Sequence, residues 1–177
     1  SYDKLNAALP RLDFGRREWR ELYPFHPATV ALLEAVVARF FSRTRSAALF
    51  CSQAASALVT ENAGAAQRVL PTALWDYIEP ELGEHPDLRP LAAVWRDWRD
   101  ALPELAPDAN DARFLAALMK GLLLFKIAGT APTVAQLANA LAFDARLPGE
   151  GNYEYAQVLL EKLRGQGSHL AVERHAE

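Results

Sequence analysis

Apolar residues recur along most of this chain at the three- and four-residue spacing that places them on one face of an α-helix. Between residues 88 and 102, Leu91, Trp95, Trp98 and Leu102 keep that spacing. Hydrophobic residues make up 51% of the 177 positions and charged residues 23%, which is the composition of a globular protein with a sizeable core. The sequence therefore predicts an all-α, mainly helical fold.

Proline, glycine and threonine positions indicate where the helices begin and end. Pro27 and Pro71 suit the first turn of a helix, because the missing N–H costs nothing there. Gly129 is expected to end a helix, and Thr133 to cap the next one. We expect helices over residues 27–43, 46–60, 71–79, 88–102, 111–128, 134–142 and 153–164, with residues 23–26 extended before a proline.

A stretch rich in turn-forming residues, 103–108, reads Pro-Glu-Leu-Ala-Pro-Asp and is the expected domain boundary. Before it we predict a helical domain over residues 1–106. After it come three expected helices and then residues 169–174, where apolar and polar residues alternate as in a half-buried strand. That order is typical of a winged helix-turn-helix, so residues 107–177 are predicted to form a winged-helix-like domain with a short β element.

Charge and hydropathy exclude several classes of partner. The formal net charge is −3, which attracts neither a nucleic-acid backbone nor an anionic membrane surface. No apolar run reaches the roughly 18 residues of a membrane span, since Lys120 and Lys126 interrupt the longest one. Cys51 is the single cysteine and cannot form an internal disulfide, which fits a reducing cytoplasm. We expect a cytoplasmic protein with no membrane partner.

The N-terminus suggests a piece of a larger protein. The chain begins Ser-Tyr-Asp-Lys-Leu, without methionine and without the apolar segment of a signal peptide. We expect the chain to come from the interior of a longer bacterial polypeptide.

Residues with catalytic chemistry are scattered. The chain contains neither a GxxxxGK[ST] phosphate cradle nor a GxGxxG turn, and one cysteine with dispersed histidines does not make a structural zinc site. His26 is expected to fix a turn by hydrogen bonding. We expect five carboxylates on solvated helix faces: Asp76, Glu79, Glu81, Asp97 and Asp100. We expect the four tryptophans in the core: Trp19, Trp75, Trp95 and Trp98. We expect no enzyme activity, no metal site and no cofactor in this part of the protein.

Arg43 and Arg45 lie at the junction of two expected helices. Guanidinium groups at an exposed corner suit bidentate contact with phosphate or carboxylate. The competing interpretation is a solvated turn in which the arginines cap the end of the preceding helix. Both interpretations stay open from the spacing alone.

The third helix of a winged helix ordinarily reads DNA, and here it would span residues 153–164. From Pro107 onward, seven Lys and Arg face eight Asp and Glu, and Glu154 lies on that helix. DNA affinity depends on phosphate contacts and therefore on a basic face. The charge favours contact with protein, and DNA contact is possible but unsupported.

Two motifs resemble the segment that follows the ATPase core in large bacterial P-loop proteins of phage-resistance systems, of the phage-growth-limitation and BREX type. They are Tyr-Pro-Phe-His-Pro at residues 23–27 and Arg-Thr-Arg-Ser at residues 43–46. Residues 70–77 and 118–124 are similar to the continuation of the same family. The resemblance covers about residues 19–163, and outside the two motifs it rests on generic helix.

The resemblance implies an AAA+-like arrangement in which a helical lid and a winged helix follow the nucleotide-binding core. Arg43 and Arg45 would then be candidates to sense the γ-phosphate of ATP. ATP and Mg²⁺ are implied for the parent protein, and its phosphate cradle, magnesium carboxylate and catalytic base would lie before Ser1. The implied partners are the ATPase core of the parent chain and other defence-system proteins.

Three functions follow as hypotheses. The first is a non-catalytic lid plus winged-helix part of an anti-phage defence ATPase, which couples the ATP state to a partner protein or to DNA. The second is a transcriptional regulator that binds DNA through its winged helix. The third is a structural helical scaffold for oligomerisation.

Overall fold

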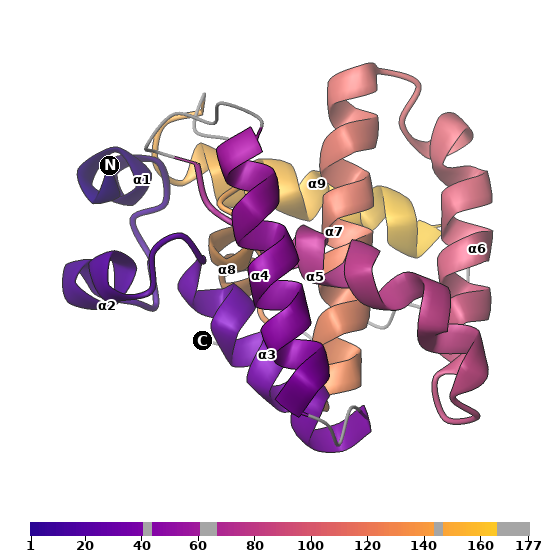
Figure 1. The fold of residues 1–177 in the computed structure, drawn as a ribbon. Helices are drawn as coiled ribbons and strands as arrows, with labels where there is room; N and C mark the ends of the chain where they lie inside the picture. Colours follow the sequence, from indigo (N-terminus) through magenta and orange to yellow (C-terminus); the bar gives the residue numbers. More distant parts are fainter. Residues whose placement is uncertain (41–43, 61–66, 144–146, 166–177) are drawn as a thin grey trace.

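The computed structural model describes residues 1–40, 44–60, 67–143 and 147–165; for residues 44–46 and 59–60 it describes the backbone only. These ranges form α-helices, one 3₁₀ helix and an isolated β-bridge, and they contain no strand (Figure 1). The prediction of an all-α fold is confirmed. The elements are α1 (Tyr2–Ala8), α2 (Arg16–Glu21), α3 (Pro27–Phe40), α4 (Thr44–Thr60), α5 (Pro71–Ile78), η1 (Glu79–Glu84), α6 (Arg89–Leu105), α7 (Ala109–Ala128), α8 (Val134–Ala140) and α9 (Gly151–Gly165).

The helix signals of the sequence act as expected in the second half of the chain. Gly129 ends α7 in the left-handed conformation, with φ 81°. Thr133 caps α8 through a reciprocal pair of bonds: its hydroxyl accepts the Gln136 N–H at 3.1 Å, and its own N–H donates to the Gln136 side chain at 2.9 Å. Pro71 begins α5, also as expected.

Three parts of the chain differ from the expectation. The short helices α1 and α2 were not predicted, because six or seven residues carry too little periodicity to recognise. Pro103 lies inside α6, so the predicted turn over residues 103–105 is wrong and the connection to α7 is only three residues long. A proline near a helix end removes one backbone hydrogen bond, and burial of Leu105 favours continuing the helix.

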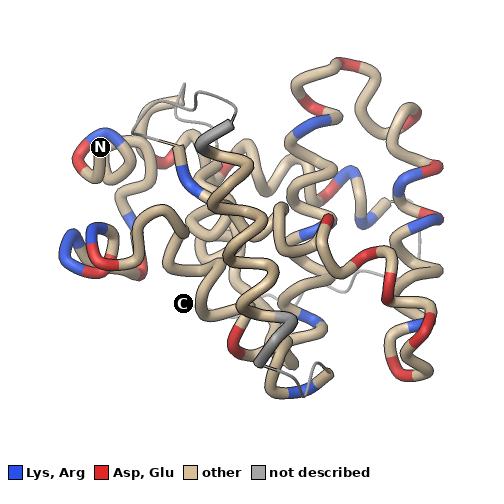
Figure 2. The backbone as a smooth tube through the Cα atoms, viewed as in Figure 1, with Lys and Arg blue, Asp and Glu red and all other residues tan. Residues whose placement is uncertain are grey.

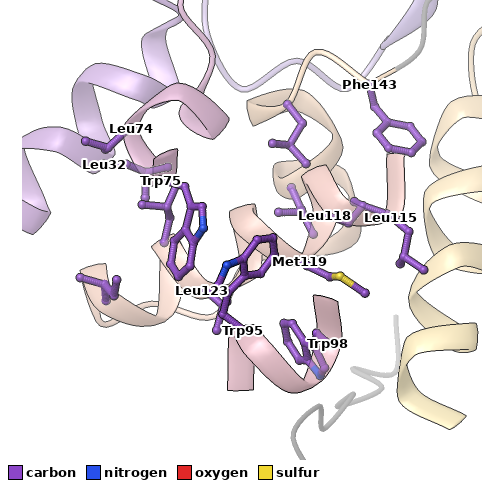
Figure 3. Packing of buried hydrophobic residues seen from close by; sticks show 14 of the residues in the cluster. Leu32, Leu74, Trp75, Trp95, Trp98, Leu115, Leu118, Met119, Leu123 and Phe143 are labelled. Atoms are coloured by element: carbon purple, nitrogen blue, oxygen red, sulfur yellow. The ribbon is translucent and has the colours of Figure 1, made fainter. Parts of the chain in front are cut away.

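Helix α7 is the centre of the core. It packs against α3, α5, α6, α8 and α9. Figure 3 shows its residues Met119 and Leu123 beside the tryptophans of α5 and α6. Trp75 and Trp95 meet edge to face with ring centroids 5.4 Å apart, an arrangement that stabilises aromatic pairs beyond their burial.

The expected domain boundary at Ala106 falls in the connection between α6 and α7. Buried residues on both sides of it belong to one continuous hydrophobic cluster. The N-terminal segment also crosses to the last helices, because the side-chain amide of Asn152 donates to the Ala8 carbonyl at 2.7 Å. The division into residues 1–106 and 107–177 stays a prediction.

Helices α7, α8 and α9 pack against one another, in the order that a winged helix requires. Gly121 of α7 allows the close approach of α8, since a Cβ there would lie 2.7 Å from the Leu137 Cδ1 atom. The predicted strand at residues 169–174 lies outside the described residues. The winged-helix identity of this part therefore stays a prediction.

A candidate binding groove beside α4

The predicted phosphate-sensing arginines, Arg43 and Arg45, follow α3 in the sequence. Arg43 is outside the described residues, and Arg45 lies in the first turn of α4 with a side chain that is also outside them. Nearby, Arg39 donates from Nη1 to the Ile127 carbonyl at 3.1 Å and so serves the C-terminal end of α7. The phosphate-sensing role of Arg43 and Arg45 stays a prediction.

The segment that carries the resemblance, residues 23–27, pairs with the residues that precede α5. The Val69 N–H donates to the Pro24 carbonyl at 2.9 Å, and the His26 N–H donates to the Val69 carbonyl at 3.0 Å. The Thr29 hydroxyl donates to that same carbonyl at 2.8 Å. The motif at residues 23–27 and the residue that directly precedes the similar segment 70–77 thus form one junction, a parallel bridge between Phe25 and Val69.

His26 lies at this junction and is fully buried. Its Nδ1 accepts the Ala28 N–H at 3.1 Å at the start of α3, which confirms the expected turn-fixing hydrogen bond. The ring meets Phe14 and Trp19 edge to face, at centroid distances of 4.9 and 5.4 Å. Burial, with a smaller contribution from the Arg68 charge, lowers the pKa of His26 to about 3. His26 is therefore neutral at physiological pH, with a structural role.

Arg68 lies against the outer side of the same aromatic cluster. Its guanidinium carbon is 3.9 Å from the centre of the Trp19 ring and 5.0 Å from that of Tyr23. Its Nη1 donates to the Phe25 carbonyl at 3.1 Å. No acidic side chain in the described ranges pairs with this guanidinium, and burial lowers the pKa of Arg68. The cation lies over the Trp19 ring and keeps unused N–H donors.

Arg68 and Trp19 line a groove of about 590 Å³ between α1, α2, α4 and α5. This volume is typical of sites for small ligands or peptide side chains. The described side chains that line the groove include the cations Lys4 and Arg68 and no carboxylate. Its apolar wall is formed mainly by Leu5, Ala54, Ala57, Leu58, Leu70 and Ala73.

A second hollow, of about 680 Å³, lies on α2 and is lined by Arg16, Arg17, Arg20 and Glu21. One short helix supplies all four side chains, and Arg17 pairs with Glu21 at 2.8 Å. Arg16 pairs with Asp3. Most of the charge of this hollow is already neutralised, so it is the weaker candidate.

Two of the carboxylates singled out from the sequence, Asp76 and Glu79, have side-chain partners. Asp76 pairs with Lys120 at 2.5 Å, and Glu79 accepts the Trp95 indole N–H at 2.9 Å. Within the described part of the chain, no three His, Cys, Asp or Glu side chains are arranged to hold a metal ion. None of the helices described is long and apolar enough to span a membrane.

The tryptophans divide between core and groove. Trp75, Trp95 and Trp98 are buried, as expected. For Trp19 the prediction is wrong, because it is half-buried beneath Arg68 and lines the groove.

The solvent face of α9 is close to neutral. Glu154, Gln157 and Val158 are exposed on it, Val158 with 55% of its surface. Lys162 pairs with Asp111 at 3.1 Å, and Arg164 pairs with Glu161 at 2.6 Å. Both cations of this helix are thus partly neutralised by carboxylates.

Comparison of the chain with known protein families, with curated proteins and with solved structures finds no match. The groove residues were not found from the sequence. Arg68 carries no motif of its own, and its position over Trp19 arises only when residues 67–70 pair with the segment before α3.

Proposed function

We propose that this chain is a non-catalytic helical module of a bacterial anti-phage P-loop ATPase, a lid followed by a winged helix, which couples ATP state to a partner protein. The observation that carries the proposal is the junction at Val69. There Val69, which directly precedes the similar residues 70–77, is joined by two hydrogen bonds to the segment at residues 23–27 and by a third to the Thr29 hydroxyl.

The nucleotide in this proposal is held mainly by the ATPase core. In this proposal Mg²⁺ and the catalytic base also belong to that core. Arg43 and Arg45 would contribute guanidinium groups to the γ-phosphate. We expect a GxxxxGK[ST] motif to be encoded before Ser1.

A partner protein is favoured over DNA by the face of α9. Sequence-independent DNA affinity needs cations that are free to contact phosphate. The two cations of α9 are engaged with Asp111 and Glu161, and Glu154 is exposed beside them.

The test uses the longer protein that contains both this chain and its ATPase core. The Arg43→Ala and Arg45→Ala variants should lower ATP turnover at least roughly tenfold, since arginines that contact a transferring phosphoryl group contribute strongly to its rate. Arg96→Ala is the matched control, because Arg96 is exposed on α6. Turnover at the wild-type rate in both variants would overturn the phosphate-sensing role.

The packed order α7, α8, α9 also supports a second candidate, a DNA-binding winged-helix regulator. Titration of the chain with duplex DNA at several salt concentrations distinguishes the two. We expect weak binding without sequence preference; tight binding that falls steeply with salt would favour the regulator.

A further inference from the structure

We propose that the groove between α1, α2, α4 and α5 binds an extended peptide segment, which presents a carboxylate to Arg68 and apolar side chains to α4. The groove can serve this role whether or not the chain belongs to an ATPase.

The first argument is charge complementarity. Arg68 has five N–H donors and uses one of them on the Phe25 carbonyl, and no carboxylate in the described ranges pairs with it. Lys4 adds a second positive charge, and no acidic side chain lines the described groove although the chain as a whole is acidic. Trp19 holds the guanidinium plane in place, which favours bidentate binding of a carboxylate.

The second argument is the surface of α4. Between residues 47 and 58 this helix carries no charged residue. In Figure 2 this stretch of α4 shows no blue or red position, whereas α6 shows many. Leu49, Gln53 and Ala57 are nevertheless exposed. Exposed helix faces of globular proteins usually carry charged residues. The uncharged, partly exposed face of α4 is therefore typical of a surface that a partner covers.

The third argument distinguishes a peptide from other ligands. The N–H and the carbonyl of Val69 both form hydrogen bonds with the segment before α3. Backbone groups alternate in direction along an extended chain, so the Arg68 carbonyl and the Leu70 N–H are directed away from that segment. Leu70 is extended, with φ −84° and ψ 163°, and within the described residues neither group has a hydrogen-bond partner. An added peptide strand would satisfy both.

Together these features specify the occupant. Main-chain donors and acceptors would align an extended peptide along residues 68–70, and Arg68 would bind an Asp or Glu side chain of that peptide. Apolar side chains of the peptide would contact Ala57 and Leu58 on α4 and Leu5 on α1.

The test is selection from a displayed library of random octapeptides on the purified chain. We expect the selected peptides to share an Asp or Glu flanked by apolar residues. A synthetic, fluorescently labelled copy of the most enriched peptide then gives affinities by fluorescence anisotropy. Arg68→Gln, which can still donate to the Phe25 carbonyl, should weaken binding at least tenfold.

Ala57→Glu should also weaken the binding at least tenfold, because it places a carboxylate in the wall that faces the acidic peptide. Ala93→Glu is the matched control: it makes the same substitution at an exposed position of α6, which does not line the groove, and the affinity should stay unchanged. Circular dichroism of each variant checks that the helices are intact.

Three results would overturn the proposal. The first is that no peptide is enriched relative to selection on Arg68→Gln. The second is an enriched set without acidic residues. The third is equal affinities for the Ala57→Glu and Ala93→Glu variants. Binding of decanoate in the groove without selection of any peptide would assign the site to small amphipathic anions instead.

Discussion

The side-chain amide of Asn139 donates to the Arg11 carbonyl at 2.7 Å, although the two residues lie 128 positions apart. Asn139 also accepts the Tyr153 hydroxyl at 3.0 Å, and that hydroxyl in turn accepts the Arg11 N–H at 3.0 Å. Asn139 is almost fully buried. One amide side chain therefore connects the N-terminal segment to both α8 and α9.

Asn139→Ala should destabilise the chain by about 2 kcal/mol, because it leaves the Arg11 carbonyl and the Tyr153 hydroxyl without their buried partner. The free energy of unfolding in urea measures this loss. Trypsin should also cleave after Arg11 faster in the variant than in the wild type, since the segment loses its attachment to α8.

Asn110→Ala is the control for this variant, because Asn110 is exposed in the first turn of α7. Its stability and its trypsin pattern should match those of the wild type. Equal cleavage after Arg11 in both variants would show that Asn139 does not hold the segment.

Gly129→Ala should cost at least about 1 kcal/mol, because a residue with a Cβ is strained in the left-handed conformation. The added atom would also meet the guanidinium of Arg39, which caps α7 through the Ile127 carbonyl. The measurement is the urea unfolding midpoint. Gly83→Ala is the control, because nothing lies near its Cβ position and its φ is not positive; an equal loss in both would refute the argument.

Burial of His26 makes stability depend on pH. The pKa is about 3 in the folded chain and near 6.5 in the unfolded chain, so the unfolded state binds the proton first. The His26 contribution is fully present above pH 6.5 and declines as the pH falls towards 3, by up to about 1.4 kcal/mol per pH unit. Unfolding curves between pH 8 and pH 4 measure this slope.

His26→Asn is the comparison for that slope. Asparagine can still accept the Ala28 N–H at the start of α3 but does not titrate. The variant should be less stable at pH 8, because it loses ring contacts with Phe14 and Trp19, yet its stability should change less with pH. Identical slopes for wild type and variant would contradict the assignment.

The contribution of Asp111 to stability should also decline as the pH falls, but in a more acidic range than that of His26. Hydrogen bonds from Tyr155 and then Lys162 lower its pKa below the ordinary value near 3.8. A carboxyl group whose pKa is lower in the folded state than in the unfolded state stabilises the fold at pH values above the unfolded-state pKa. This contribution is lost as the pH falls through the folded-state pKa. Asp111→Asn should therefore be less stable than the wild type at pH 7, and the difference should shrink at pH 3. Asp87→Asn, on an exposed turn, should show no such difference.

The sequence predicts most of the helices because their signals are local. Gly129 and Thr133 end and begin helices through bonds to residues within a few positions. Pro103 shows the limit of such signals, since packing of Leu105 in the core extends α6 past a residue that disfavours helix.

The groove could not be predicted, because it depends on contacts between distant segments. Trp19 has the spacing of a core residue, and Arg68 looks like an ordinary surface arginine. Only the bridge between Phe25 and Val69 brings Arg68 over the Trp19 ring. Periodicity along one helix contains no information about such pairing.

The N-terminal segment is a mechanical link between the two candidate interaction surfaces. Its helices α1 and α2 form one wall of the groove through Leu5 and Trp19, while Ala8 and Arg11 are bonded to α9. A displacement of α9 by a partner would therefore pull directly on the groove wall without passing through α4 or α5. Occupancy of the groove and engagement of the last helix would then influence each other in both directions, as thermodynamic coupling requires.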